Sequence, residues 1–141
     1  MLGACIGDII GSVYEFNAWK SREFPLFSEK SEFTDDTVCT IAVAECLLDG
    51  SDPAAGLRKW CHRYPGRGYG GSFAVWLRDA GMGPYNSYGN GAAMRVSPAA
   101  WLAGDLDEAL ALARHVTSVT HNHPEGIKGA EATVTAIWLV R

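Results

Sequence analysis

The sequence lacks an excess of basic residues. Its 12 lysines and arginines are outnumbered by 16 aspartates and glutamates, so the 141-residue chain has a formal net charge of -4. Proteins that bind a nucleic-acid backbone carry a basic patch, because they must neutralise phosphates. We therefore expect no binding to a nucleic-acid backbone, and any bound phosphate must be met by a few local groups.

Long hydrophobic runs and cysteine pairs are also missing. Asp8 interrupts the apolar N-terminal stretch, which has no basic residue before it, so we expect neither a signal peptide nor a membrane span. The four cysteines include no C-x-x-C pair, and Cys39 and Cys46 lie within an apolar segment. This pattern disfavours a zinc site and indicates reduced packing residues in a cytoplasmic protein.

No useful run alternates apolar and polar residues, as a half-buried strand would. Apolar residues recur at helical spacing instead, 48% of the residues are hydrophobic, and the length suits one core. We therefore predict a single all-α domain over residues 1–141. The predicted helices are 2–16, 38–48, 53–64, a short helix capped by Ser72, a helix beginning near Ala92, 106–116 and 127–138.

The segment Thr34-Asp35-Asp36-Thr37 stands directly before the apolar run from Val38 to Leu48. A helix apolar on nearly every face is buried, which fixes the position of the residues before it. Thr34 or Asp35 fits an N-cap, and the acidic residues suit the positive end of the helix dipole. Four oxygen-bearing side chains in a row also suit Mg²⁺, which prefers oxygen ligands. Both interpretations stay open on these residues alone.

The first predicted helix carries glycines and two carboxylates. Gly3, Gly7 and Gly11 recur every four residues, although each glycine costs about 1 kcal/mol relative to alanine in a helix interior. That spacing predicts a smooth stripe where another helix packs closely. Asp8 and Glu15 are seven residues apart and share a face, so they belong either to the solvated surface or to a site.

A glycine-rich loop from Gly81 to Gly91 leads into Ala92. Its last glycines permit either close backbone approach or positive φ, and a following helix would offer free N–H groups to an anion. Tyr85 and Tyr88 are suited to stacking on a base or ribose, while the alternative is a plain turn. Further along, His121 and His123 form a weak metal pattern, and a hydrogen-bonding role for His121 is favoured.

Four motifs occur in order, and together they span nearly the whole chain. They are Gly7-Asp8 through Glu15, Thr34-Asp35-Asp36-Thr37, Ser87-Tyr88-Gly89-Asn90-Gly91-Ala92-Ala93-Met94-Arg95, and Thr120-His121. Because it carries these motifs in this order, the chain resembles the ADP-ribosylglycohydrolase family, which includes the dinitrogenase reductase-activating glycohydrolases. The resemblance implies a multi-helix orthogonal bundle with two Mg²⁺ ions, or Mn²⁺. It also implies hydrolysis of the bond between C1 of ADP-ribose and an acceptor, which reverses ADP-ribosylation.

The resemblance assigns roles residue by residue. Thr34, Asp35 and Asp36 match metal ligands, and Glu15 matches an acidic residue near the scissile bond that serves as base or gate, so Glu15 and Asp36 are the implied catalytic residues. The residues implied to bind the substrate are Ser87, Tyr88, Gly89, Asn90, Gly91 and His121. The chemistry is consistent, because nearby negative charge stabilises an oxocarbenium-like transition state.

One family motif has no counterpart. The second set of metal ligands, an Asp-x-Asp-Thr motif, is absent, and Asp105-Leu106-Asp107-Glu108 is the nearest sequence. The last predicted helix also reaches Arg141 without a stop signal. We therefore expect the N-terminal half of such an enzyme, with an apolar face at Ile127, Ile137 and Trp138 left exposed and promoting self-association.

Three functions remain possible on the sequence. The first is a Mg²⁺-dependent ADP-ribosyl hydrolase, and the second is a non-catalytic member of the same fold that binds ADP-ribose or has a structural role. The third and weakest is another Mg²⁺-dependent phosphohydrolase that uses Asp35 and Asp36.

Overall fold

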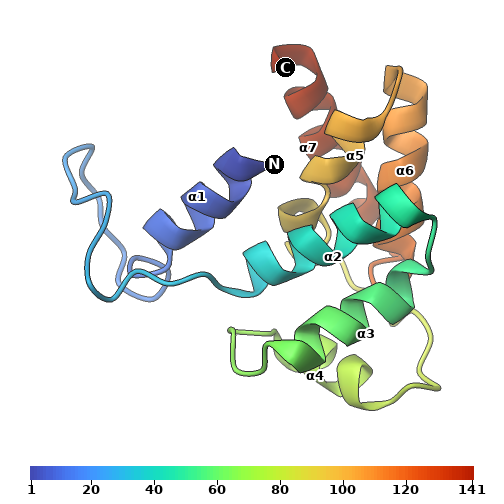
Figure 1. Ribbon diagram of the computed structural model, residues 1–141, viewed down its shortest axis with the longest axis horizontal. Coiled ribbons are helices and arrows are strands. Elements are labelled where there is room, and N and C mark those ends of the chain that lie inside the picture. The colour runs from blue at the N-terminus through green and yellow to red at the C-terminus, as the bar shows by residue number, and fades with distance from the viewer.

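The computed structural model describes residues 1–141 as seven α-helices and one 3₁₀ helix, without a strand (Figure 1). This confirms the predicted all-α fold class. None of the helices is both long and apolar enough to cross a membrane. The elements are α1 (Leu2–Gly11), α2 (Asp35–Asp49), α3 (Pro53–Arg63), α4 (Gly71–Arg78), η1 (Ala93–Arg95), α5 (Ser97–Leu102), α6 (Leu106–Ser118) and α7 (Pro124–Val140).

Helix α2 is the central element. Thr34 is its N-cap, and Gly50 ends it at a φ of 73°, a left-handed conformation that glycine adopts without a steric penalty. The prediction of a buried helix is confirmed, since more than half of its residues are buried. In Figure 1 the helix lies between α3 and α5, and it contacts both.

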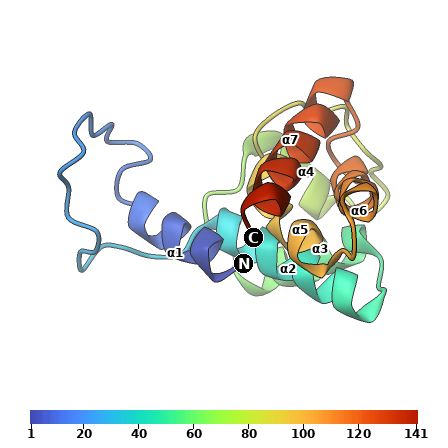
Figure 2. The same cartoon turned by 90° about the horizontal axis from the view of Figure 1, so that it is seen from above.

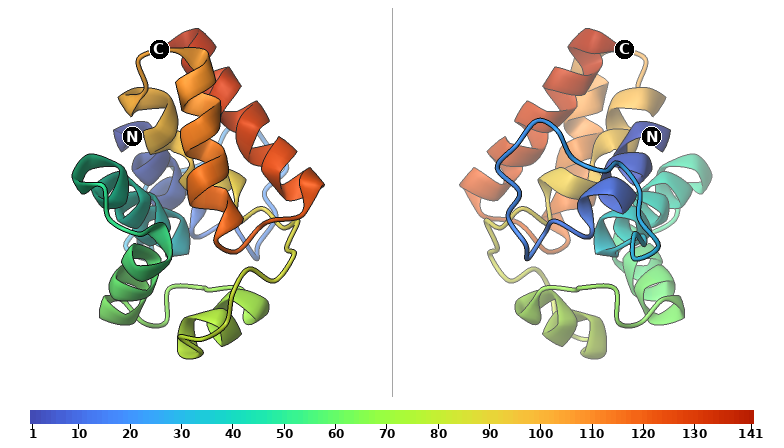
Figure 3. Two further views of the ribbon diagram at one scale, coloured as in Figure 1. Left: turned by 90° about the vertical axis from the view of Figure 1, so that its right-hand side faces the viewer. Right: turned by 90° about the vertical axis from the view of Figure 1, so that its left-hand side faces the viewer.

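Two hydrophobic clusters meet at α2. One is built largely of alanine and valine from α2, α5, α6 and α7, including Val43, Ala113 and Val134. Small side chains allow these helices to lie close together, and Figure 3 shows α6 and α7 as an adjacent pair. The other cluster joins α2 to α3 and α4, and its larger members include Leu57 and Trp76. A helix between two clusters must be apolar on both sides, which explains the composition of α2.

Helix α1 and residues 12–33 extend away from this body, as Figure 2 shows from above. The helix ends at Gly11 rather than at residue 16, and none of its residues is buried. The predicted close packing on its glycine stripe is wrong, because no atom lies within 4 Å of a β-carbon built on Gly3, Gly7 or Gly11. Close helix packing occurs instead at Gly56, where a β-carbon would lie 2.1 Å from the sulfur of Cys46.

Three further expectations need correction. Gly70, not Ser72, is the N-cap of α4, and the helix expected near Ala92 is only the short 3₁₀ turn η1. The face expected to be exposed at the C-terminal helix is partly covered, since Ile137 and Trp138 pack against the alanine-rich cluster. Ile127 is half-buried too.

Candidate functional site

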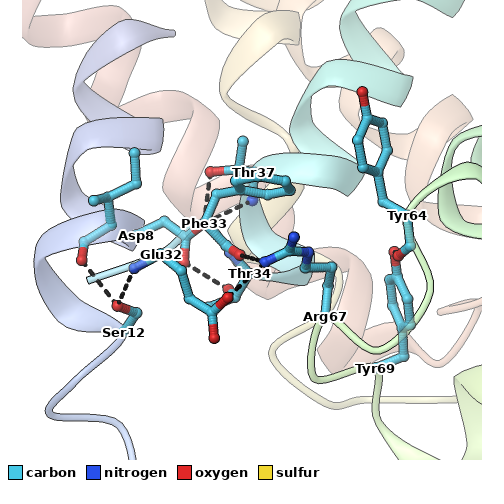
Figure 4. A network of polar contacts seen from close by, with 10 residues as sticks. Asp8, Ser12, Glu32, Phe33, Thr34, Thr37, Tyr64, Arg67 and Tyr69 are labelled. Atoms are coloured by element: carbon cyan, nitrogen blue, oxygen red, sulfur yellow. Dashed lines mark hydrogen bonds and ion pairs between the residues drawn. The ribbon is translucent and has the colours of Figure 1, made fainter. Parts of the chain in front are cut away.

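The N-terminus of α2 is tied to α1 through Asp8. Its two carboxylate oxygens accept four hydrogen bonds: from the backbone N–H groups of Thr34 (2.8 Å) and Thr37 (3.2 Å), and from both threonine hydroxyls (2.5 Å each) (Figure 4). On the other side, Arg67 donates to Glu32 at 2.6 Å and lies over the ring of Phe33. Asp8, whose role the sequence left open, therefore holds the start of α2.

Thr34 serves as a cap in this arrangement. Its hydroxyl donates to Asp8 and accepts from the backbone N–H of Asp36 at 3.4 Å. The capping interpretation of this segment is confirmed, and it leaves the carboxylates of Asp35 and Asp36 free. Neither of them, nor Glu15, forms an ion pair with a lysine or arginine.

The carboxylates at this point repel one another. Burial, and then the neighbouring Asp36, raises the pKa of Asp35 from 3.8 to about 6. Burial, and then Asp8 and Glu15, raises the pKa of Asp36 as well. Half-buried carboxylates with raised pKa values and no cationic partner form an acidic cluster that a cation would stabilise.

A cleft of about 360 Å³ lies beside this cluster. Of the ten residues that the sequence analysis placed in the site, it is lined by Glu15, Asp35, Asp36, Ser87, Gly89, Asn90, Gly91 and His121. Thr34 lies outside it and lines an adjoining cavity with Asp8. Tyr88 also lies outside, with 73% of its surface exposed, and its ring faces His123 at 5.2 Å between centroids.

The loop before η1 is attached to the turn between α6 and α7. The backbone N–H of Asn86 donates to the side chain of Asn122 at 2.7 Å, and that of Tyr85 donates to the carbonyl of Thr120 at 3.3 Å. Asn86 has a φ of 54°, a conformation that asparagine tolerates. At Gly126 a β-carbon would lie 2.8 Å from the carbonyl oxygen of Ser87. The absence of a side chain on Gly126 thus allows α7 to support the loop.

His121 lines the same cleft as the acidic cluster. Its side chain is buried, and its Nδ1 lies 2.8 Å from the hydroxyl of Thr120. Burial, and then the positive charge of Arg95, lowers the pKa of His121 to about 4, so the ring is neutral at pH 7. A β-carbon on Gly91 would lie 2.9 Å from the ring. Close backbone approach, one of the two roles open for the loop glycines, is therefore the role of Gly91.

Sequence reasoning missed several residues of the cleft. Gly68 lies there with a φ of 93°, and a β-carbon on it would be 3.5 Å from a carboxylate oxygen of Asp35. The carbonyl of Arg67 accepts the backbone N–H of Asp35 at 2.7 Å. The glycines from Gly66 to Gly71 were the available signal, but they fit no phosphate-binding pattern. Others that line the cleft are Phe73, Met94 and Arg95. Tyr85, which the sequence indicated for stacking on a base or ribose, lines the cleft too.

The acidic cluster has the donor atoms of a cation site. Glu15, Asp35 and Asp36 all line the cleft and offer the hard oxygen atoms that Mg²⁺ prefers. As they stand, no three acidic, histidine or cysteine side chains converge closely enough to hold a metal ion. The donor chemistry thus fits Mg²⁺, and the ligand assignment stays a prediction.

Comparisons with known proteins identify the family of this chain. The family model described as ADP-ribosylglycohydrolase matches residues 1–140. ADP-ribosylhydrolase ARH3 of Xenopus tropicalis is 29% identical over 168 aligned residues, which cover 97% of this chain and 48% of the relative. ADP-ribosylhydrolase ARH3 of Mus musculus is 28% identical over 174 aligned residues, which cover 99% of this chain and 47% of the relative. The chain spans about half the length of these curated relatives, and it belongs to the ADP-ribosylglycohydrolase family.

Proposed function

We propose that the cleft binds ADP-ribose and that a protein containing this chain hydrolyses the bond between C1 of ADP-ribose and an acceptor group, with Mg²⁺. The observation that supports this most directly is one cleft lined both by unpaired carboxylates and by a glycine loop with a neutral histidine. ADP-ribose combines ribose hydroxyls with an anionic diphosphate, and the two sets of residues suit these groups respectively.

The residues have separate tasks in this proposal. Asp35 and Asp36 would hold Mg²⁺, which when bound orients ribose hydroxyls and polarises a water molecule. Glu15 removes a proton from the attacking water as the bond between C1 and the acceptor breaks. The departing acceptor atom then takes up that proton, so that the acceptor leaves protonated and Glu15 is again a carboxylate. The negative charge of the acidic cluster stabilises the positive charge that develops on the ribose ring. No covalent intermediate with the protein is required.

The glycine loop binds the rest of the ligand. Ser87, Gly89, Asn90 and Gly91 line the cleft, and glycines allow a diphosphate to approach the backbone N–H groups. Tyr85 lies beside His121, with 6.0 Å between ring centroids, and presents a ring against which a ribose or base can pack.

Release of free ADP-ribose from peptides carrying ADP-ribosyl-serine or ADP-ribosyl-arginine, with and without Mg²⁺, tests this function. Asp36→Asn is expected to lower the rate on the order of a thousandfold, since a lost metal ligand costs roughly 4 kcal/mol of transition-state stabilisation. Asp107→Asn is the matched control, because Asp107 is an exposed acidic residue in the first turn of α6. Equal rates for the two variants would contradict the metal-ligand assignment.

A second candidate function is binding of ADP-ribose without turnover. It is favoured by the absence of three converging metal-ligating side chains. Calorimetry with ADP-ribose separates the two functions, since saturable binding with no release of ADP-ribose from either peptide identifies a binding protein. Release of phosphate from a generic ester would instead support a phosphohydrolase.

A further inference from the structure

A chain of three side chains runs from the core to the wall of the cleft. Arg95 is almost completely buried, with 1% of its surface exposed. Its Nη2 atom donates to the backbone carbonyl of Val116 at 3.1 Å and to the hydroxyl of Thr120 at 2.7 Å. A guanidinium group carries only donors, so the oxygen of Thr120 must accept in this hydrogen bond.

The Thr120 hydroxyl can then donate its proton to only one acceptor. Thr120 is fully buried, and the only other polar atom bonded to its hydroxyl is Nδ1 of His121, at 2.8 Å. A buried hydroxyl that donates to nothing loses a hydrogen bond, which disfavours that state by about tenfold or more. Thr120 therefore donates its proton to Nδ1, and Nδ1 acts as the acceptor.

The position of the ring proton of His121 follows. A neutral imidazole carries one proton, and the nitrogen that accepts a hydrogen bond cannot carry it. The proton thus lies on Nε2. Nε2 faces the glycine loop, since it would lie 3.0 Å from a β-carbon on Gly91 and 3.9 Å from one on Gly89. Both glycines line the cleft together with His121.

We propose that Arg95 and Thr120 are positioning residues that hold His121 in the tautomer with its proton on Nε2. His121 then presents a hydrogen-bond donor beside the glycine loop. A ligand must then place an acceptor oxygen beside Nε2, and a group that can only donate is rejected. The identification of that ligand as ADP-ribose rests on the proposed function. The tautomer itself depends only on the three side chains.

Long-range ¹H–¹⁵N NMR spectra of the ligand-free, ¹⁵N-labelled chain at pH 7 test the tautomer directly. Protonated and unprotonated ring nitrogens have well-separated shifts. We expect a proton on Nε2 of His121, none on Nδ1, and a slowly exchanging hydroxyl proton on Thr120 coupled to Nδ1. A proton on Nδ1, in either a neutral or a charged ring, would overturn the proposal.

Binding of ADP-ribose, measured by calorimetry with Mg²⁺ present, tests the consequence for the ligand. Thr120→Val keeps the shape of the side chain and removes the hydroxyl, and we expect it to weaken binding about tenfold. Thr120→Ser restores the hydroxyl and should recover most of the lost affinity. Thr133→Val is the remote control, because the Thr133 hydroxyl donates only to the carbonyl of Gly129 on the surface of α7.

The two experiments separate this inference from the proposed function. If the unaltered chain carries the proton on Nε2 but does not bind ADP-ribose, the tautomer is supported and the proposed function fails. If the unaltered chain binds ADP-ribose and Thr120→Val binds it equally well, the proposed function stands and the positioning role is wrong.

Discussion

The acidic cluster and the group around His121 differ in how their polar groups are satisfied. Asp35 and Asp36 are half-buried and have no cationic partner, and their pKa values are raised. His121 and Thr120 instead form a hydrogen bond with each other, and Arg95 supports them from the core. One part of the cleft lining therefore leaves its carboxylates without a partner, whereas the other is held by hydrogen bonds within the protein.

Both parts nevertheless depend on a residue that does not line the cleft. Asp8 holds the backbone from which Asp35 and Asp36 project, and Gly126 allows α7 to approach the loop beside His121. Changing either residue should disturb one part and spare the other. Such changes show whether the two parts are separate structural units.

The largest effect is expected from Asp8→Ala. It removes an acceptor of four hydrogen bonds and leaves the backbone N–H groups of Thr34 and Thr37 without their partner. We expect a loss of about 3 kcal/mol in the free energy of unfolding, measured by urea denaturation.

NMR spectra of the Asp8→Ala variant also show which part of the structure the substitution changes. The ring resonances of His121 should keep their positions, because the side chain of Asp8 bonds only to Thr34 and Thr37. Asp107→Ala, on the surface of α6, serves as the control. A loss of stability no greater than that of the control would show that Asp8 does not hold α2.

A smaller effect, on the loop beside His121, is expected from Gly126→Ala. The added β-carbon would lie 2.8 Å from the carbonyl of Ser87, so the loop must move, at a cost of about 2 kcal/mol. Gly129→Ala on the same helix meets no atom within 4 Å and should raise stability by roughly 0.5–1 kcal/mol. Thermal denaturation of both variants measures the difference, and equal changes would exclude the close contact.

The smallest effect is expected from Asp35→Asn, and it depends on pH. Because the folded-state pKa of Asp35 is raised to about 6, the folded protein favours the protonated carboxyl, and that stability is present below pH 4 and lost as the pH rises through 6. Asparagine resembles the protonated form. The midpoint of thermal unfolding without metal should rise by about 2 °C at pH 8, allowing for solvent screening, and stay unchanged at pH 4.

The response of the unfolding midpoint to Mg²⁺ tests whether Asp35 binds the metal. Added Mg²⁺ should raise the unfolding midpoint of the unaltered chain at pH 8, since binding to the folded state stabilises it, and leave that of Asp35→Asn unchanged. An Asp35→Asn variant that responds to Mg²⁺ as the unaltered chain does would remove Asp35 from the metal site.

Local signals in the sequence predicted the body of the fold well. The helix starts predicted at residues 53 and 106 were confirmed, and α2 ends at Asp49, one residue beyond its predicted end, because each of these boundaries depends on residues within one turn. The buried character of α2 was equally visible, since its apolar residues cover every face.

Features that depend on distant contacts could not be read in this way. The glycines of α1 suggested a packing stripe, but spacing does not show whether a partner helix is present, and the close contact is at Gly56. Ser72 has the right chemistry for a cap, yet the helix begins one residue earlier, at Gly71.

The candidate site shows the same division. Eight of the ten residues that motif order predicted for the site line one cleft, but motif order did not indicate the supporting roles of Asp8 and Arg95. Their partners lie far along the chain, at Thr34 and Thr120. Tyr88 does not line the cleft, and its side chain is exposed instead.

The separation of these partners along the chain also bears on folding kinetics. The pair α6 and α7 is joined by a short turn, whereas the bonds that shape the cleft link residues 26 apart at Asp8 and Thr34, 25 apart at Arg95 and Thr120, and 36 apart at Asn86 and Asn122. Closing long loops costs chain entropy before any contact repays it. We therefore expect the α6–α7 hairpin to form early and the cleft to assemble last, which makes the cleft the first region to open under destabilising conditions.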